Sequence, residues 1–289
     1  MHRGACLIVV VVVVAGCAGP QLARAPEPEE ASARLFSWNV NFGLAGDPAA
    51  LELIANSGAD VVLLQETNEE WERAIRGRLR TVYPHMEFHH CCRAGGLAVL
   101  SKGKIVDVEV LPAVSWFPAL RAVVDTPIGP VETLNVHLRP PFGDDGGVVS
   151  GWFETPAVRE QEMLAFATAL EEHTGSVVVG DFNEDEGRAI SALQERGYVD
   201  ALPLFWPEQP TWHWPIAGVD VKLRLDHVFV RAGRLEVIDV HVEEAGGSDH
   251  FPMVAVLILA EDDDDGDATA AAARRGPTSS SSLSWRSHR

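Results

Sequence analysis

One feature constrains this chain more than any other: apolar runs of strand length repeatedly meet a polar residue at one end. The runs lie at 35–41, 60–66, 131–137, 177–183, 223–230 and 248–259. Helical patterns lie between them, at 49–58, 69–80, 157–172 and 188–196. Because strands outnumber helices, and the runs are both alternating and continuous, the sequence predicts an α/β or α+β domain whose sheets are covered by helices.

The polar residues at these ends are carboxylates, imidazoles and amides. Each alone has an ordinary explanation, because Asn and Asp are common in turns and a single His is often structural. Together they suggest a shared rim, where open-sheet enzymes bind ligands. Oxygen ligands suit Mg²⁺, Mn²⁺ or Ca²⁺. His beside Asp suits proton transfer, or charge stabilisation at phosphorus.

Six motifs follow one another along the chain: SWNVN, LLQE, NVHL, GDFN, RLDHVFV and SDHFP. In this order they resemble the endonuclease/exonuclease/phosphatase superfamily, whose fold is DNase I-like, and the resemblance covers residues 34–260. It implies a four-layer α/β sandwich, in which two packed, mainly antiparallel sheets are flanked by helices. It also implies a divalent-metal-dependent phosphoester hydrolase, in particular a phosphodiesterase, with its site at one rim of the sandwich.

The resemblance implies a metal site. Asn39 and Glu66 match the metal-proximal pair, with Glu66 as the principal ligand of Mg²⁺ (or Mn²⁺ or Ca²⁺), and Asp249 would lie near the ion. Asn41 stands where the family often has Asp, which leaves a second metal position open. Glu66 has an ordinary alternative role, as an acid at the start of the following helix.

The resemblance also implies catalytic roles. Asp181 and Asn183 would orient or deprotonate the attacking water and hold the phosphate. His250 would stabilise the pentacovalent phosphorane, hydrogen-bonded by Asp226, and His137 would act as a second histidine. The ordinary alternatives are a turn for Asn183 and a salt bridge with Arg224 for Asp226. These alternatives stay open at the level of sequence.

Four residues are candidates for substrate binding: Arg93, Arg139, Trp212 and Trp214. Arg93 precedes the apolar run GLAVLS, and Arg139 follows His137. Both could hold phosphate, or they could be solvated surface charges. The tryptophans belong to an aromatic loop, 205–215, which could stack on a base or enter a lipid interface. Plain packing beneath a long loop is the alternative for the tryptophans.

The N-terminal residues read as a bacterial lipoprotein signal. A short positive start precedes an apolar run from Ala5 to Ala15, too short to span a bilayer comfortably, and the run closes on Val14-Ala15-Gly16-Cys17, which resembles a lipobox. The expected organisation is a signal peptide over 1–16, lipidation at Cys17, a flexible tether over 17–33 and a disordered acidic, Ser-rich tail over 261–289. An ordinary signal peptide with a chance Cys is the alternative.

Two adjacent cysteines, Cys91 and Cys92, remain once Cys6 and Cys17 are set aside. Beside His89 and His90 they invite a zinc interpretation, but four consecutive residues wrap poorly around a tetrahedral ion. We therefore expect a loop with buried or oxidised thiols.

The charge bears on the substrate. The chain has 42 acidic against 23 basic residues, a formal net charge of -19, and this disfavours long DNA, because phosphate contacts supply most of the affinity for it. The sequence therefore predicts a monomeric phosphodiesterase anchored to the bacterial envelope through lipid. Its substrate would be a nucleic acid or a phospholipid head group. A non-catalytic binding lipoprotein with the same fold is the rival hypothesis.

Overall fold

The computed structural model describes residues 20–142, 151, 154–170, 175–216 and 218–260. The expected signal peptide, Cys17 and the expected tail at 261–289 lie outside these residues. Within them, no helix is long and apolar enough to cross a membrane.

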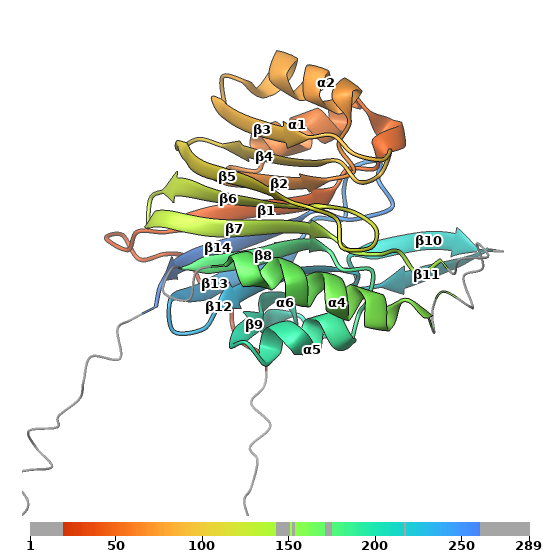
Figure 1. Ribbon diagram of the computed structural model, residues 1–289. Helices are drawn as coiled ribbons and strands as arrows, with labels where there is room; N and C mark the ends of the chain where they lie inside the picture. Colours follow the sequence, from red (N-terminus) through yellow and green to blue (C-terminus); the bar gives the residue numbers. More distant parts are fainter. Residues whose placement is uncertain (1–19, 143–150, 152–153, 171–174, 217, 261–289) are drawn as a thin grey trace, which may run out of the picture.

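Two six-stranded sheets form the centre of the molecule (Figure 1). The first sheet contains, in spatial order, β13 (Leu235–Val242), β14 (Met253–Leu259), β1 (Ala33–Asn39), β2 (Val61–Gln65), β4 (Leu97–Ser101) and β3 (His85–His89). The second contains β5 (Ile105–Leu111), β6 (Ala119–Thr126), β7 (Gly129–His137), β8 (Ser176–Asp181), β12 (Asp226–Arg231) and β9 (Tyr198–Asp200). A separate hairpin, β10 (Trp212–Ile216) with β11 (Val219–Leu223), extends from one end.

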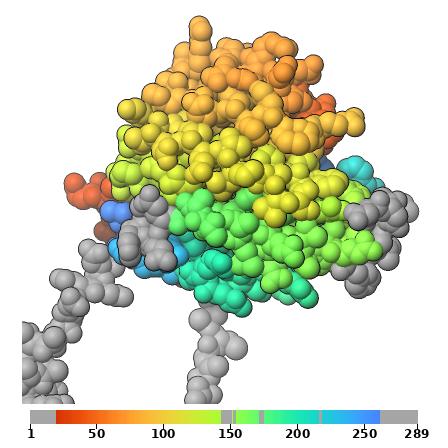
Figure 2. All heavy atoms as spheres, in the orientation of Figure 1, coloured from red at the N-terminus to blue at the C-terminus, as the bar shows by residue number. Residues whose placement is uncertain are grey.

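Each sheet is antiparallel apart from one parallel pair. That pair is β1 with β2 in the first sheet and β7 with β8 in the second. Helices flank both sheets (Figure 1). The space-filling view shows α2, the β3–β5 region, α4 and α5 as successive bands down one face (Figure 2). The prediction of two packed, mainly antiparallel sheets flanked by helices is confirmed.

Alternation along the strands explains the layers. In β1, Leu35 points into the core between the sheets, whereas Phe36 and Trp38 point outward against helices. In β8, Val177 and Val179 face the same inner core. Because both faces of these strands are covered, they read in the sequence as continuous apolar runs rather than alternating ones.

The described residues form four helices at the predicted places and one further short helix that the sequence did not predict. They are α1 (Pro48–Asn56), α2 (Glu69–Leu79), α4 (Pro156–Phe166), α5 (Arg188–Gln194) and the short α6 (Ala201–Phe205), with 3-10 turns at Phe42–Leu44 and Ala167–Ala169. The expectation of one helix over 157–172 was too long. The chain tightens after Phe166, and Leu170 has an extended backbone (ψ 135°) although its side chain continues the apolar pattern and packs on the core.

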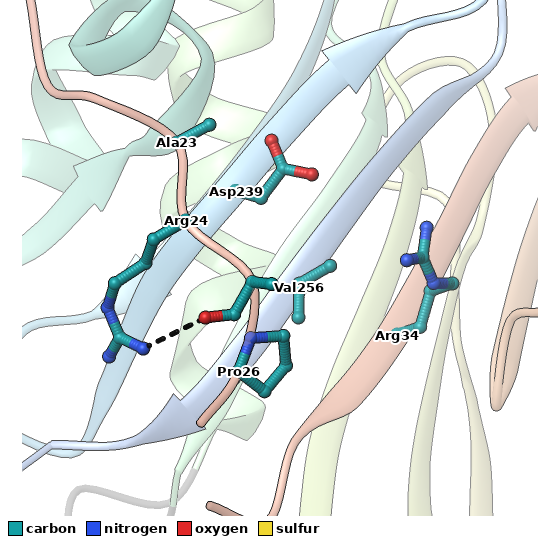
Figure 3. A pocket seen from close by; sticks show the side chains of 7 residues that line it. Ala23, Arg24, Pro26, Arg34, Asp239 and Val256 are labelled. Atoms are coloured by element: carbon teal, nitrogen blue, oxygen red, sulfur yellow. Dashed lines mark hydrogen bonds between the residues drawn. The ribbon is translucent and has the colours of Figure 1, made fainter. Parts of the chain in front are cut away.

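The segment predicted as a flexible tether is irregular, but its described part contacts the domain. The backbone N–H groups of Gln21 and Arg24 donate to the carbonyls of Leu204 and Ile238. Residues 23–26 then cross β13 and β14, where they line a pocket of about 300 Å³ with Asp239 and Val256 (Figure 3). This pocket lies on the outer surface of the first sheet, away from the motif residues.

Strand direction brings the motifs to one edge. The parallel strands β1 and β2 end there in register at Asn39 and Gln65, as do β7 and β8 at His137 and Asp181. The antiparallel β12 starts at the same edge, since Asp226 pairs with Asp181. The rim expected from strand ends is thus built from both strand ends and strand starts.

Candidate active site

Two histidines face one carboxylate at this edge. Asp181 and His137 are register partners at the ends of β8 and β7, and His250 comes from the turn before β14. The Nε2 atoms of His137 and His250 each lie 3.5 Å from Asp181 Oδ2. All three side chains are buried, so surrounding water screens their charges weakly.

Asp226 orients His250 through the ring nitrogen that faces away from Asp181. Its Oδ2 accepts a hydrogen bond of 2.8 Å from His250 Nδ1. Burial lowers the pKa of His250, but the carboxylates of Asp226 and Asp181 outweigh this effect and raise the pKa to about 10. Arg224, the partner for Asp226 that the sequence left open, pairs with Asp185 instead. His250 is therefore an imidazolium at neutral pH.

Asp181 is suited to accept a proton. Burial raises the pKa of its carboxyl group, against the lowering effect of His250 and His137, and a raised carboxyl pKa favours general-base action near neutral pH. Asn183 has a left-handed backbone (φ 54°), and its N–H donates to Asp181 Oδ1 at 2.9 Å. Its side-chain Nδ2 donates to the Leu138 carbonyl at 3.0 Å. Asn183 thus fixes both Asp181 and the chain leaving β7.

His137 is held by the loop between β3 and β4. Its Nδ1 lies 3.1 Å from the carbonyl oxygen of Ala94, and because a carbonyl only accepts hydrogen bonds, Nδ1 carries a proton. The Phe117 ring packs against the imidazole, with centroids 4.8 Å apart. These contacts leave Nε2 directed at Asp181.

Glu66 and Asp181 share one amide partner. Asn39 Nδ2 lies 3.1 Å from both Glu66 Oε1 and Asp181 Oδ2. Glu66 takes a left-handed backbone (φ 61°) at the end of β2, and its Oε2 accepts from the Phe42 N–H at 3.2 Å. The carboxylate oxygens of Glu66, which is partly exposed, and of buried Asp181 therefore approach the same amide. Together they form a set of oxygen ligands. This set fits Mg²⁺, Mn²⁺ or Ca²⁺.

Asp181, Asp226 and His250 also offer ligand atoms within 4.8 Å of one another, and these atoms could hold a metal. However, both ring nitrogens of His250 face carboxylates, and an imidazolium has no free lone pair for a metal. The oxygen atoms of Glu66 and Asp181 therefore fit a cation better.

Asp249 joins the site to the β10–β11 hairpin. Its Oδ1 accepts from Asn41 Nδ2 at 3.2 Å, and its Oδ2 accepts from Trp212 Nε1 at 3.0 Å. Asn41 thus anchors a neighbouring carboxylate. Trp214 stacks on Trp212, with ring centroids 6.3 Å apart and planes 6° from parallel, and it is 48% exposed.

The two arginines proposed for substrate binding lie in different settings. Arg93 is exposed in the loop that carries Ala94, in a left-handed conformation (φ 66°). Arg139 is half-buried, and its guanidinium lies 4.4 Å from the centroid of the Trp116 ring. Along the chain, Arg93 precedes Ala94, whose carbonyl contacts His137, and Arg139 follows His137 by two residues.

Cys91 and Cys92 form a disulfide in the same loop. This agrees with the expectation of oxidised thiols, but Cys92 is exposed rather than buried. The bonded sulfur atoms are not available as thiolate ligands, and the adjacent His90 instead lies 2.6 Å from Glu72. The zinc interpretation of this stretch is therefore not supported.

Some contributors to the site were not expected from the sequence. Ala94 acts only through its carbonyl oxygen. Glu162 lies in a helix with no motif, and its carboxylate is buried among loops at the rim. One signal for Glu162 was available in the sequence: it stands four residues before Phe166, on the apolar face of the helix, where an acid needs specific partners.

The sandwich fold and a site of carboxylates, amides and histidines at one end of its strands together define a class: hydrolases of phosphoesters. The chain belongs to the Endonuclease/Exonuclease/phosphatase family, whose profile matches residues 36–250. It is accordingly a phosphoester hydrolase. No curated protein sequence matches the chain.

Solved structures share the fold at low identity. An endonuclease/exonuclease/phosphatase from Beutenbergia cavernae is 20% identical, with a TM-score of 0.63, over 80% of this chain and 72% of that one. An AP endonuclease from Archaeoglobus fulgidus is 17% identical, with a TM-score of 0.61, over 77% and 98%. The 3′ phosphatase NExo from Neisseria, bound to a product DNA hairpin, is 21% identical, with a TM-score of 0.58, over 77% and 98%.

Proposed function

We propose that this hydrolase is a divalent-metal-dependent phosphodiesterase. The observation that carries the proposal is the arrangement around Asp181, whose Oδ2 is approached by two imidazoles and by the amide that also binds Glu66. Three parts then lie together at one end of the strands. They are a general base, a charged histidine that can donate hydrogen bonds, and carboxylate oxygens that can bind a divalent cation. In-line hydrolysis at phosphorus requires these three parts.

The residues divide the reaction among them. Asp181 takes the proton of the attacking water, because burial raises the pKa of its carboxyl group. His250, kept charged by Asp226, donates hydrogen bonds to the phosphoryl oxygens as negative charge develops on them. Mg²⁺ bound by Glu66, with Asp181 and Asn39 beside it, would neutralise part of the same charge.

A nucleic-acid phosphodiester is the first candidate substrate. Among proteins of the same fold, NExo from Neisseria is described with a product DNA hairpin, and TDP2 from D. rerio with a single-strand DNA product. The net charge of -19 disfavours long duplexes, so we propose short or single-stranded substrates. A phospholipid head group is the second candidate, favoured by the exposed Trp214 and Val219 on the β10–β11 hairpin.

We further propose an envelope location through lipidation at Cys17. The support is the lipobox-like Val14-Ala15-Gly16-Cys17 after an apolar run. Expression of the full chain with radiolabelled palmitate should label the protein, and Cys17→Ser should abolish the label. Equal labelling of the two chains would contradict the lipid anchor.

The test of activity uses the full chain with Mg²⁺, and the same samples with EDTA. Bis-p-nitrophenyl phosphate, single-stranded DNA, plasmid DNA and sphingomyelin are the substrates. We expect EDTA-sensitive turnover of the first two, with plasmid DNA cleaved more slowly. Turnover that persists in EDTA would refute metal dependence, and preferred cleavage of sphingomyelin would favour the second substrate.

A further inference from the structure

A buried carboxylate on α4 ties two loops of the rim together. Glu162 is completely buried. Its Oε1 accepts the backbone N–H of Trp116 at 3.0 Å, and its Oε2 accepts the backbone N–H of Arg139 at 2.9 Å. Trp116 belongs to the loop between β5 and β6, whereas Arg139 follows β7. One side chain therefore fixes the separation of two segments that are not neighbours in sequence.

The side chains on these segments form a continuous surface that reaches the catalytic histidine. The Arg139 guanidinium lies 4.4 Å from the Trp116 ring centroid. The Trp116 and Phe117 rings meet at 5.8 Å, and Phe117 lies 4.8 Å from His137. Trp116 is 41% exposed, so an aromatic surface remains open at the rim, and Phe117 connects it to His137.

This surface has a specific chemistry. An exposed indole binds planar groups by stacking, and a guanidinium adds both stacking and attraction to a phosphate oxygen. A phosphate that carries an aromatic ester group can both stack on the indole and attract the guanidinium. A phosphate that carries a small aliphatic group can only attract the guanidinium. Because Phe117 lies between Trp116 and His137, the surface suits an aromatic group on one side of the reacting phosphate.

Burying Glu162 is costly, which argues that its contacts are specific. Burial raises the pKa of its carboxyl group, and the two backbone N–H donors, together with the charges of Arg139 and His137, work in the opposite direction. A packed apolar residue at this helix position would avoid that cost. The position instead holds an acid that fits two donors from different loops.

We propose that Glu162 is a positioning residue that holds Trp116 and Arg139 as a recognition surface for an aromatic ester group of the substrate. The proposal rests on the proposed phosphodiesterase function. It names the side of the site, next to His137, on which that ester group lies.

The experiment compares two non-hydrolysable inhibitors of bis-p-nitrophenyl phosphate turnover, phenylphosphonate and methylphosphonate. The full-length wild type should bind the phenyl compound about tenfold more tightly, as expected for one stacked ring. Trp116→Ala should reduce this preference to less than about twofold. Glu162→Gln, which replaces one acceptor oxygen by a donor, should reduce the preference in the same way.

Glu160→Gln is the matched control. Glu160 lies on the same helix, is partly exposed and pairs with Arg188 on the surface. The same change of charge there should leave the phenyl preference as in wild type.

An undiminished phenyl preference in Trp116→Ala would overturn the recognition surface, even if Glu162→Gln failed to fold. Equal weakening of both inhibitors in folded Glu162→Gln would overturn the positioning role. Failure of wild type to hydrolyse the diester would instead refute the proposed function.

Discussion

Replacing Asp226 by Asn tests how His250 works. The substitution keeps the volume and one acceptor oxygen beside His250 Nδ1, 2.8 Å away in wild type, but removes the negative charge. Burial then lowers the pKa of His250 with only Asp181 as the main opposing charge, so the imidazolium is less populated. A hydrogen bond to a charged group contributes about 1.5–3 kcal/mol. If that energy is realised in the transition state, kcat should fall roughly ten- to 150-fold.

The assay measures kcat for bis-p-nitrophenyl phosphate at saturating Mg²⁺, together with the thermal unfolding midpoint. The neighbouring residue on β12 offers a matched control, because His227 forms a second buried pair with Asp200, at 2.7 Å. Asp200→Asn removes the same charge from the same kind of pair outside the site, and it should lower stability while leaving kcat within about twofold. A loss of kcat in Asp226→Asn no greater than in Asp200→Asn would refute the role of Asp226.

A double-mutant cycle sharpens this result. His250→Ala should reduce turnover to a small residual rate, and it should also lower the melting temperature, because the buried carboxylates of Asp226 and Asp181 lose their counter-charge. If Asp226 acts through His250, adding Asp226→Asn to His250→Ala should lower the residual rate no further. Additive losses would show that Asp226 acts on the substrate by another route.

Other predictions concern the metal and the pH dependence of stability. Glu66→Gln should raise the Mg²⁺ concentration needed for half-maximal rate, and its activity should recover partly at high Mg²⁺. Asp181→Asn should not recover, because it removes the proton acceptor. Equal losses in both variants that do not respond to Mg²⁺ would contradict this division of roles between Glu66 and Asp181. Burial lowers the pKa of His227, but Asp200 outweighs it and the pKa is raised. The pair therefore adds stability that is complete below about pH 6.5 and declines as the pH rises through the folded-state pKa. Urea unfolding should show the deficit of Asp200→Asn to be largest in acid, and a deficit that grows with pH would contradict this sign.

The sequence by itself determined the class of fold and the residues at its active edge. Apolar runs such as Val177–Val179 predict buried strands, because strand periodicity is local and both faces of these strands are covered. The positions of His137, Asp181 and His250 beside such runs follow from the same local pattern. The α4 helix was predicted too long because apolar spacing continues through Leu170, whereas its backbone becomes extended.

Only the tertiary structure decided which groups meet. Asp226 has both Arg224 and His250 as conceivable partners in the sequence, and the β12–β8 register together with the turn before β14 selects His250. The Ala94 carbonyl reaches His137 across 43 residues, and Glu162 reaches Arg139 across 23. Such contacts depend on strand order and loop path, which are set by packing of the whole domain, so no local pattern of residue types encodes them.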